Sequence, residues 1–259
     1  MSTPPPPMPE AALPQQPVQP ALSEPARLIK TFTAPTETFA DVKRRGGWWA
    51  PWLLVGIVAV ASLVFAGQKI GYETLTRQQI ERSSRAQQFD NLPAEQQDRQ
   101  IAIAAKVTQI FYYIVPVFTL IFGLVVAAIL MAVFNFGFDA QVPFSRALGI
   151  VFYSYLPGVI AGILAIISVA LNSNPEGINV RNMVASNPAY FMDPATSSKF
   201  LYQFLSGIDI FAIWTICLMG IGFAVNASSR KLSRGTAIGT VFALFIVWKL
   251  ISSAIGFGG

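Results

Sequence analysis

The sequence contains no histidine and a single cysteine, Cys217. Histidine is the commonest general base and metal ligand in proteins, so its absence removes the usual basis for acid–base catalysis or a zinc site. One cysteine cannot form an intrachain disulfide, and its position in an apolar run disfavours the reactive thiolate. We therefore expect no catalytic residue, no metal ion and no cofactor.

Charged residues are also scarce. They make up 12% of the sequence and hydrophobic residues make up 53%, whereas an ordinary soluble domain carries roughly 25% charge. Apolar windows of about 20 residues, the length needed to cross a hydrocarbon core of about 30 Å, recur along the chain. The composition predicts an all-α fold, namely a polytopic transmembrane helical bundle with short interfacial helices.

Five apolar runs are long enough to be spans. They cover about residues 48–67, 110–134, 147–171, 208–226 and 236–255. The polar segment 68–108 contains two helical stretches separated by Asn91, Leu92 and Pro93, and the second is expected to continue into the second span. The segment 172–193 is rich in Asn and Pro and is expected to be irregular. Together these elements predict one membrane domain over residues 27–259.

Residues 1–26 differ from the rest of the chain. They include nine prolines and almost no large apolar residues, a composition typical of a disordered, partly polyproline segment. Such a tail serves either as a ligand for a proline-reading module or as a tether, and the sequence leaves both interpretations open.

Two short helices are expected to lie in the membrane interface. After Pro35, Phe39 and Val42 fall on one helical face, and a basic cluster follows before the first span. Near the fourth span, Asp193 starts a second helical pattern that continues to Ile208. These segments are expected to place polar faces at the headgroups and apolar faces towards the lipid.

Basic residues indicate an orientation. The net charge is +5, and the dense basic clusters flank short connections that fall on one side of a five-span path. These residues are Lys43, Arg44, Arg45, Arg146, Arg230, Lys231 and Arg234. We expect that side to be cytoplasmic, with the N-terminus inside and the C-terminus outside. Because the basic residues adjoin apolar spans, anionic lipid headgroups are the expected partner, and nucleic acid is not.

Two charged residues lie within the predicted spans. An ionised side chain at the bilayer centre costs about 3 kcal/mol on insertion scales. The fourth and fifth spans run antiparallel, so Asp209 and Lys249 both lie within about 10 Å of the same boundary. We predict an ion pair between them, direct or bridged by water. The alternatives are that Asp209 caps its helix and that Lys249 extends to the interface alone.

The segment Tyr153–Gly158 interrupts the third span. Pro157 has no backbone N–H and breaks the helical ladder, and Tyr153 and Tyr155 supply hydroxyls beside the break. The segment is either a discontinuous helix that lines a polar site, as in transporters, or a simple kink. Gly158 and Gly162 then form a GxxxG pattern, which predicts close approach of another helix.

Several short motifs resemble the Yip domain family, the Ypt- and Rab-interacting membrane proteins, over roughly residues 27–255. They are a Phe-Pro-Phe pattern before the first span, a Trp and Pro opening of that span, a Tyr and Pro break, and a DxFxxW pattern followed by glycine. The residues concerned are Phe32, Pro35, Phe39, Tyr155, Pro157, Asp209, Trp214 and Gly222.

The resemblance implies a five-span membrane protein with a cytosolic N-terminus. In eukaryotic relatives it implies binding of small GTPases and of other family members. Here the loops 68–108 and 172–207 are far longer, which resembles the bacterial branch and argues against GTPase binding. We therefore expect a scaffold or adaptor of the bacterial inner membrane, without catalytic activity, that contacts other membrane proteins or itself. The alternative is a small-solute or lipid transporter with a polar site between spans three, four and five.

Overall fold

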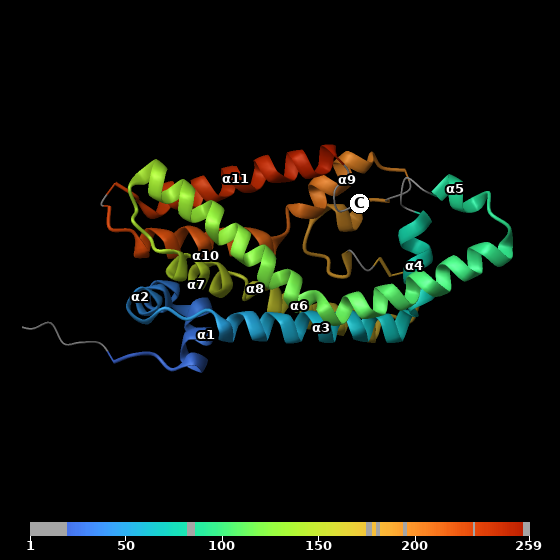
Figure 1. The fold of residues 1–259 in the computed structure, drawn as a ribbon, viewed down its shortest axis with the longest axis horizontal. Helices are drawn as coiled ribbons and strands as arrows, with labels where there is room; N and C mark the ends of the chain where they lie inside the picture. The colour runs from blue at the N-terminus through green and yellow to red at the C-terminus, as the bar shows by residue number, and fades with distance from the viewer. Residues whose placement is uncertain are drawn as a thin grey trace, which may run out of the picture.

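A computed structural model of the chain describes residues 20–81, 86–174, 178–179, 182–193, 196–229 and 231–255. Within these ranges the regular elements are helices, and no strand occurs (Figure 1). The helices are α1 (Glu24–Thr33), α2 (Pro35–Arg45), α3 (Trp49–Ile70), α4 (Tyr72–Glu81), α5 (Ala86–Asp90), α6 (Ala94–Phe138), α7 (Phe144–Ser154), α8 (Pro157–Leu171), the 3-10 helix η3 (Pro188–Phe191), α9 (Lys199–Gly207), α10 (Ile210–Asn226) and α11 (Arg234–Ala254).

Four segments are long and apolar enough to cross a membrane. They are α3, α6, the α7–α8 pair over Phe144–Leu171, and α11. The helices α9 and α10 form a fifth crossing when they are taken as one span bent by 52°. This architecture confirms the predicted all-α membrane bundle. In addition, α6 is 45 residues long, or about 67 Å, so it extends well beyond a hydrocarbon core of about 30 Å.

The elongated molecule has two distinct ends (Figure 1). At one end, α2 meets the α6–α7 and α10–α11 connections, where the backbone N–H of Ser228 donates to the carbonyl of Ala140 at 2.9 Å. We call this the basic end, because it carries the predicted basic clusters, apart from Arg230, which lies outside the described residues. The opposite, distal end carries α4, α5, η3 and α9.

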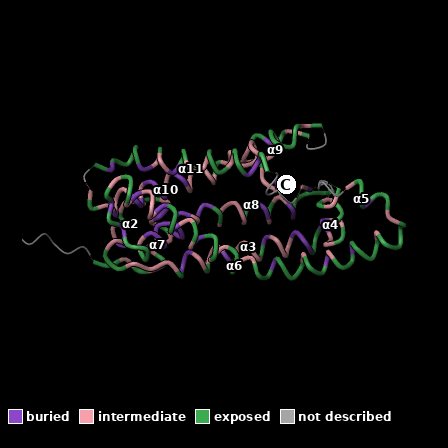
Figure 2. The backbone as a smooth tube through the Cα atoms, turned by 45° about the horizontal axis from the view of Figure 1, so that its top comes forward, coloured by how far each residue is buried: buried purple, intermediate pink, exposed green. Residues whose placement is uncertain are grey.

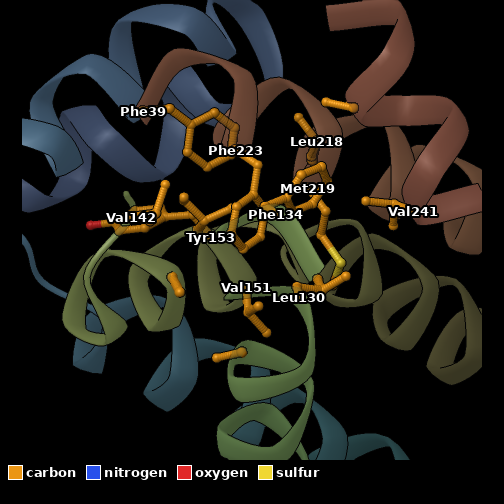
Figure 3. Close-up of a cluster of buried hydrophobic side chains, with 14 of the residues drawn as sticks. Phe39, Leu130, Phe134, Val142, Val151, Tyr153, Leu218, Met219, Phe223 and Val241 are labelled. Carbon is orange, nitrogen blue, oxygen red and sulfur yellow. The ribbon is translucent and has the colours of Figure 1, made fainter. Parts of the chain in front are cut away.

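The main hydrophobic core lies towards the basic end. Phe134 of α6 stacks on Phe223 of α10 with ring centroids 4.5 Å apart, and Val151 and Tyr153 of α7 lie beside them (Figure 3). The outer surface of the long helices is instead largely exposed (Figure 2), and 22% of the apolar window of α6 is buried. Apolar side chains exposed over such a length are stable when they face hydrocarbon, as expected for a membrane span.

The N-terminal region differs in detail from the prediction. Helix α1 begins at Glu24, capped by Ser23, with Pro25 in its first turn, so ordered structure starts before the predicted boundary at residue 27. Of the predicted tail over residues 1–26, residues 1–19 lie outside the described residues. Moreover, the interfacial helix expected from Pro35 is α2, and a further helix that was not predicted, α1, precedes it. The two helices are separated at Ala34 because Pro35 has no N–H to continue the first helix.

Candidate functional site

A buried ion pair joins α1 to α2. The Nε of Arg27 donates to Oδ2 of Asp41 at 2.6 Å, and Nη2 of Arg27 lies 2.6 Å from the same oxygen. The two side chains are 2% and 0% exposed. Arg44 donates from Nη2 to the other carboxylate oxygen, Oδ1, at 2.8 Å. Because each buried charge has an opposite charge and several hydrogen bonds, the pair meets the conditions under which buried ions are tolerated.

The same group of residues connects the α1–α2 hairpin to α7. Arg27 Nη1 donates to the carbonyl of Gly46 at 2.9 Å and lies 3.2 Å from Oε1 of Glu24. The hydroxyl of Tyr153 on α7 donates to Oε2 of Glu24 at 2.7 Å. Glu24, Arg27, Asp41, Arg44 and Tyr153 form what we call the hairpin ion cluster.

The charges of the hairpin ion cluster stabilise one another. Burial by itself raises the pKa of Asp41, but the hydrogen bond and charge of the Arg27 guanidinium outweigh it and hold the pKa of that carboxyl below its usual value. Sequence reasoning missed this cluster. The sequence contained two features that could have pointed to the cluster. Arg27 and Thr31 are four residues apart, so they share one face of a helix. Asp41 is the residue before Val42 and the second after Phe39, and the helical pattern placed Phe39 and Val42 on the apolar face.

Asp209 caps helix α10. Its Oδ1 accepts hydrogen bonds from the backbone N–H groups of Phe211 at 2.8 Å and Ala212 at 3.3 Å, while its Oδ2 accepts from the hydroxyl of Ser186. The backbone of Ser186 also accepts from the N–H of Ile210 at 3.0 Å. The carboxylate is therefore used to start the helix and to hold the segment before η3 against the α9–α10 bend.

The predicted direct ion pair between Asp209 and Lys249 is wrong for this structure. None of the ion pairs among the described residues involves either side chain. Lys249 instead packs its aliphatic chain on Gly207, where an added Cβ would overlap Cε and lie 2.6 Å from Nζ. Because Lys249 contacts Gly207, which precedes Asp209 by two positions, Lys249 and Asp209 lie at the same depth, as predicted. The hydrogen bonds of Asp209 run to Ser186 and to the backbone of α10 instead.

The break in the third span occurs where it was predicted, between Ser154 and Pro157. Its hydroxyls do not converge on one site. Tyr153 donates to Glu24, Ser154 donates from Oγ to the carbonyl of Ile150 at 2.7 Å, and the ring of Tyr155 packs edge-on against Phe152. Within the described residues, the buried Tyr155 hydroxyl has no hydrogen-bond partner. The segment therefore has the properties of a packed kink.

The two glycines of the GxxxG pattern behave differently. A Cβ on Gly162 would lie 2.6 Å from Cγ1 of Val58, so this glycine permits the close approach of α8 to α3. A Cβ on Gly158 would meet nothing within 4 Å. The pattern therefore predicted one tight contact correctly and overstated the role of the other glycine.

The motifs at the two ends of the chain contact each other. Phe32 of α1 packs edge-on against Trp214 of α10, with centroids 5.5 Å apart. A Cβ on Gly222 would lie 3.1 Å from the ring of Phe39. The side-chain amide of Asn226 donates to the carbonyl of Phe39 at 3.1 Å. The α1–α2 hairpin is thus docked on α10 through matched aromatic and small residues.

Comparison with known proteins is consistent with this arrangement. A model of the Yip1 domain matches residues 29–252, from α1 into α11. Searches of curated proteins and of solved structures found no match. The motif residues on α1, α2 and α10 that touch one another all lie inside the matched region. Since the match covers most of the sequence, the chain belongs to the Yip1 domain family of membrane proteins.

Proposed function

We propose that this protein is a non-catalytic scaffold of the bacterial inner membrane, which holds the α1–α2 hairpin at the cytoplasmic surface for contact with other membrane proteins. The observation that carries the proposal is that the polar residues of the spans make separate contacts and do not contact one another. Asp209 caps a helix, Lys249 packs on Gly207, and Tyr155 packs on Phe152. A transport site instead requires polar groups that face one shared, water-accessible path.

The docking of the hairpin supports the same function. The hairpin is fixed to α10 by Phe32 and Phe39 and to α7 by the contact of Glu24 with Tyr153. Lys43 donates from Nζ to the carbonyls of Val225 at 3.2 Å and Ala227 at 3.3 Å. These bonds satisfy the free carbonyls at the C-terminal end of α10. A hairpin held at three places presents a fixed surface, as a scaffold requires.

The orientation follows from charge density. The basic end groups Lys43, Arg44 and Arg45 with Arg146 and Lys231, and cytoplasmic connections are enriched in such residues. The basic end then faces the cytoplasm and its anionic headgroups, each basic residue near the surface contributing about 1 kcal/mol to lipid attraction. Five crossings place the C-terminus outside. Alkaline phosphatase fused after residue 259 is expected to be active in a bacterial host, and an inactive, intact fusion contradicts the orientation.

The scaffold function is tested by crosslinking in native membranes. A photoreactive amino acid at Glu37, which is on the exposed side of α2, is expected to capture a reproducible set of membrane proteins. The same amino acid at lipid-facing Val247 of α11 is the control and is expected to capture none of that set. Identical capture at both positions contradicts the proposal.

A variant separates the scaffold from a transporter. Asp209→Asn retains a side-chain oxygen that caps α10, so the scaffold function predicts near-normal yield and unchanged crosslinking. If Asp209 were a proton- or ion-coupled transport residue, the same variant would abolish transport while leaving expression intact.

A further inference from the structure

A lateral groove of about 520 Å³ lies between α3 and α6. Its lining is almost entirely apolar, and it is open to the side rather than enclosed. The lining residues are Trp52, Leu53, Gly56, Ile57, Val60, Ala61, Val64, Phe65, Gln68, Tyr113 and Pro116. Since α3 and α6 are both membrane-spanning helices, the open side of this groove faces hydrocarbon.

The two helices are held together at one end of the groove. The indole Nε1 of Trp52 donates to the carbonyl of Pro116 at 3.0 Å. A Cβ on Gly56 would lie 3.1 Å from Cβ of Pro116, so the glycine allows the proline ring to approach α3. From Trp52 to Gln68 the lining runs 16 residues along α3, or about 24 Å. The groove is therefore long, narrow and fixed by a specific contact.

The surroundings favour one kind of occupant. The groove is shallow and elongated, since a volume of about 520 Å³ extends over about 24 Å of α3. Hydrocarbon is the solvent on the open side of the groove, so the acyl chains of lipids are the molecules that reach it.

The groove has few polar residues, and the lysines beyond it lie towards the distal end. Gln68 lies at the distal end of the lining, and Tyr113 lies one helical turn from Pro116. Two exposed lysines lie beyond Gln68 and Tyr113 in the distal direction. Lys69 follows Gln68 on α3, and Lys106 precedes Tyr113 by two helical turns on the same face of α6. Among the described residues, neither lysine forms an ion pair. Two cations beyond an apolar groove complement a lipid with an anionic headgroup.

We propose that the α3–α6 groove binds one anionic phospholipid of the leaflet at the distal end. One acyl chain lies along α3 towards Trp52, and the phosphate lies between Lys69 and Lys106. This site is independent of the scaffold function, because it lies on the lipid-facing side of α3 and α6, away from the hairpin and α10.

The test uses the full chain in liposomes of phosphatidylcholine that contain a small fraction of phosphatidylglycerol with a photoreactive group in its acyl chain. Crosslinked residues are mapped by mass spectrometry. Binding in the groove predicts that modification concentrates on the lining residues of α3 and α6. Even labelling of every lipid-facing helix overturns the proposal, as does crosslinking of two protein copies through these residues.

Matched variants test the groove itself. Ala61→Phe places a ring in the groove at an exposed position and is expected to reduce labelling of the lining about fivefold. This reduction corresponds to a loss of about 1 kcal/mol of binding free energy. Ala128→Phe makes the same change at an exposed position of α6 outside the lining, and it is expected to leave labelling unchanged. Equal labelling in the two variants contradicts the proposal.

The headgroup assignment has its own test. Replacing both Lys69 and Lys106 with Ala is expected to lower the preference of the groove for photoreactive phosphatidylglycerol over photoreactive phosphatidylcholine roughly tenfold. Labelling by the phosphatidylcholine probe should persist, because the apolar groove is intact, and this persistence also shows that the variant is folded. An unchanged preference overturns the assignment of the anionic headgroup.

Discussion

The buried pair of Arg27 and Asp41 makes a strong prediction about stability. Replacing Asp41 with Asn keeps the shape of the side chain but removes its charge, so the guanidinium of Arg27 remains buried with less compensation. Removing one partner of a buried pair costs roughly 3–5 kcal/mol. We take the lower bound, because Arg27 retains Glu24 at 3.2 Å and the carbonyl of Gly46 at 2.9 Å. The free energy of unfolding should therefore fall by about 3 kcal/mol.

The single cysteine provides the assay. Cys217 is partly buried in α10, so a thiol-reactive fluorophore reports its exposure as the detergent-solubilised protein is heated. For a chain of this size, 3 kcal/mol corresponds to a fall in melting temperature of roughly 6–12 °C. The control is Glu95→Gln, which removes a pair with Arg99 whose side chains are 78% and 75% exposed. Such a pair contributes about 0.3–0.5 kcal/mol, so this control should lower the melting temperature by no more than roughly 2 °C.

A double variant completes the test. Replacing Arg27 with Met and Asp41 with Leu removes both charges together, and apolar replacement of a buried ion pair is often neutral or stabilising. We expect the double variant to recover most of the stability that Asp41→Asn loses. If Asp41→Asn is no less stable than Glu95→Gln, the pair is not buried as described and the reasoning is refuted.

Three further predictions follow from other contacts. In Gly220→Leu the side chain would collide with the backbone of Ile238, since an added Cβ lies 2.5 Å from its Cα, whereas Gly239 has open space. Gly220→Leu should abolish folded yield in size-exclusion chromatography, and equal yields of Gly220→Leu and Gly239→Leu would count against the α10–α11 packing. Asp209→Ala should lower the free energy of unfolding by about 1 kcal/mol while Asp209→Asn retains most of it, measured by thermal unfolding, because the lost contribution is a helix cap. The folded-state pKa of Asp41 is lowered, so its contribution to stability is present above the unfolded-state pKa of about 3.9 and is lost as the pH falls through the lower folded-state value. Between pH 5 and pH 3, the melting temperature of the Asp41→Asn variant should therefore fall less than that of the natural sequence. An equal fall would contradict the conclusion that Asp41 is ionised in the folded protein.

Most of the architecture could be predicted from the sequence because bilayer thickness imposes a length on apolar runs. The five expected spans correspond to α3, α6, the α7–α8 pair, the bent α9–α10 pair and α11. The continuation of a polar helix into the second span was also correct, since nothing between Ala94 and Phe138 breaks the helical ladder except Pro116, which the helix accommodates.

The candidate sites were less accessible to sequence reasoning. Depth along a span follows from residue counting, so Asp209 and Lys249 were placed at the same level correctly. The contacts of a side chain also depend on segments that return from elsewhere in the chain, and Ser186 belongs to a loop for which no conformation could be derived. For the same reason the pairing of Arg27 with Asp41, on two helices separated by a break at Ala34, was not foreseen.

In the topology that we propose, the chain crosses the bilayer five times and the basic end lies in the cytoplasm. In a Cys217→Ala background, single cysteines at Gln96, Ser228 and Ile129 sample the distal end, the basic end and a lipid-facing span. With a membrane-impermeant maleimide, we predict labelling of position 96 in intact cells, of position 228 after permeabilisation alone, and of position 129 in neither case. Labelling of positions 96 and 228 from the same side would contradict the account.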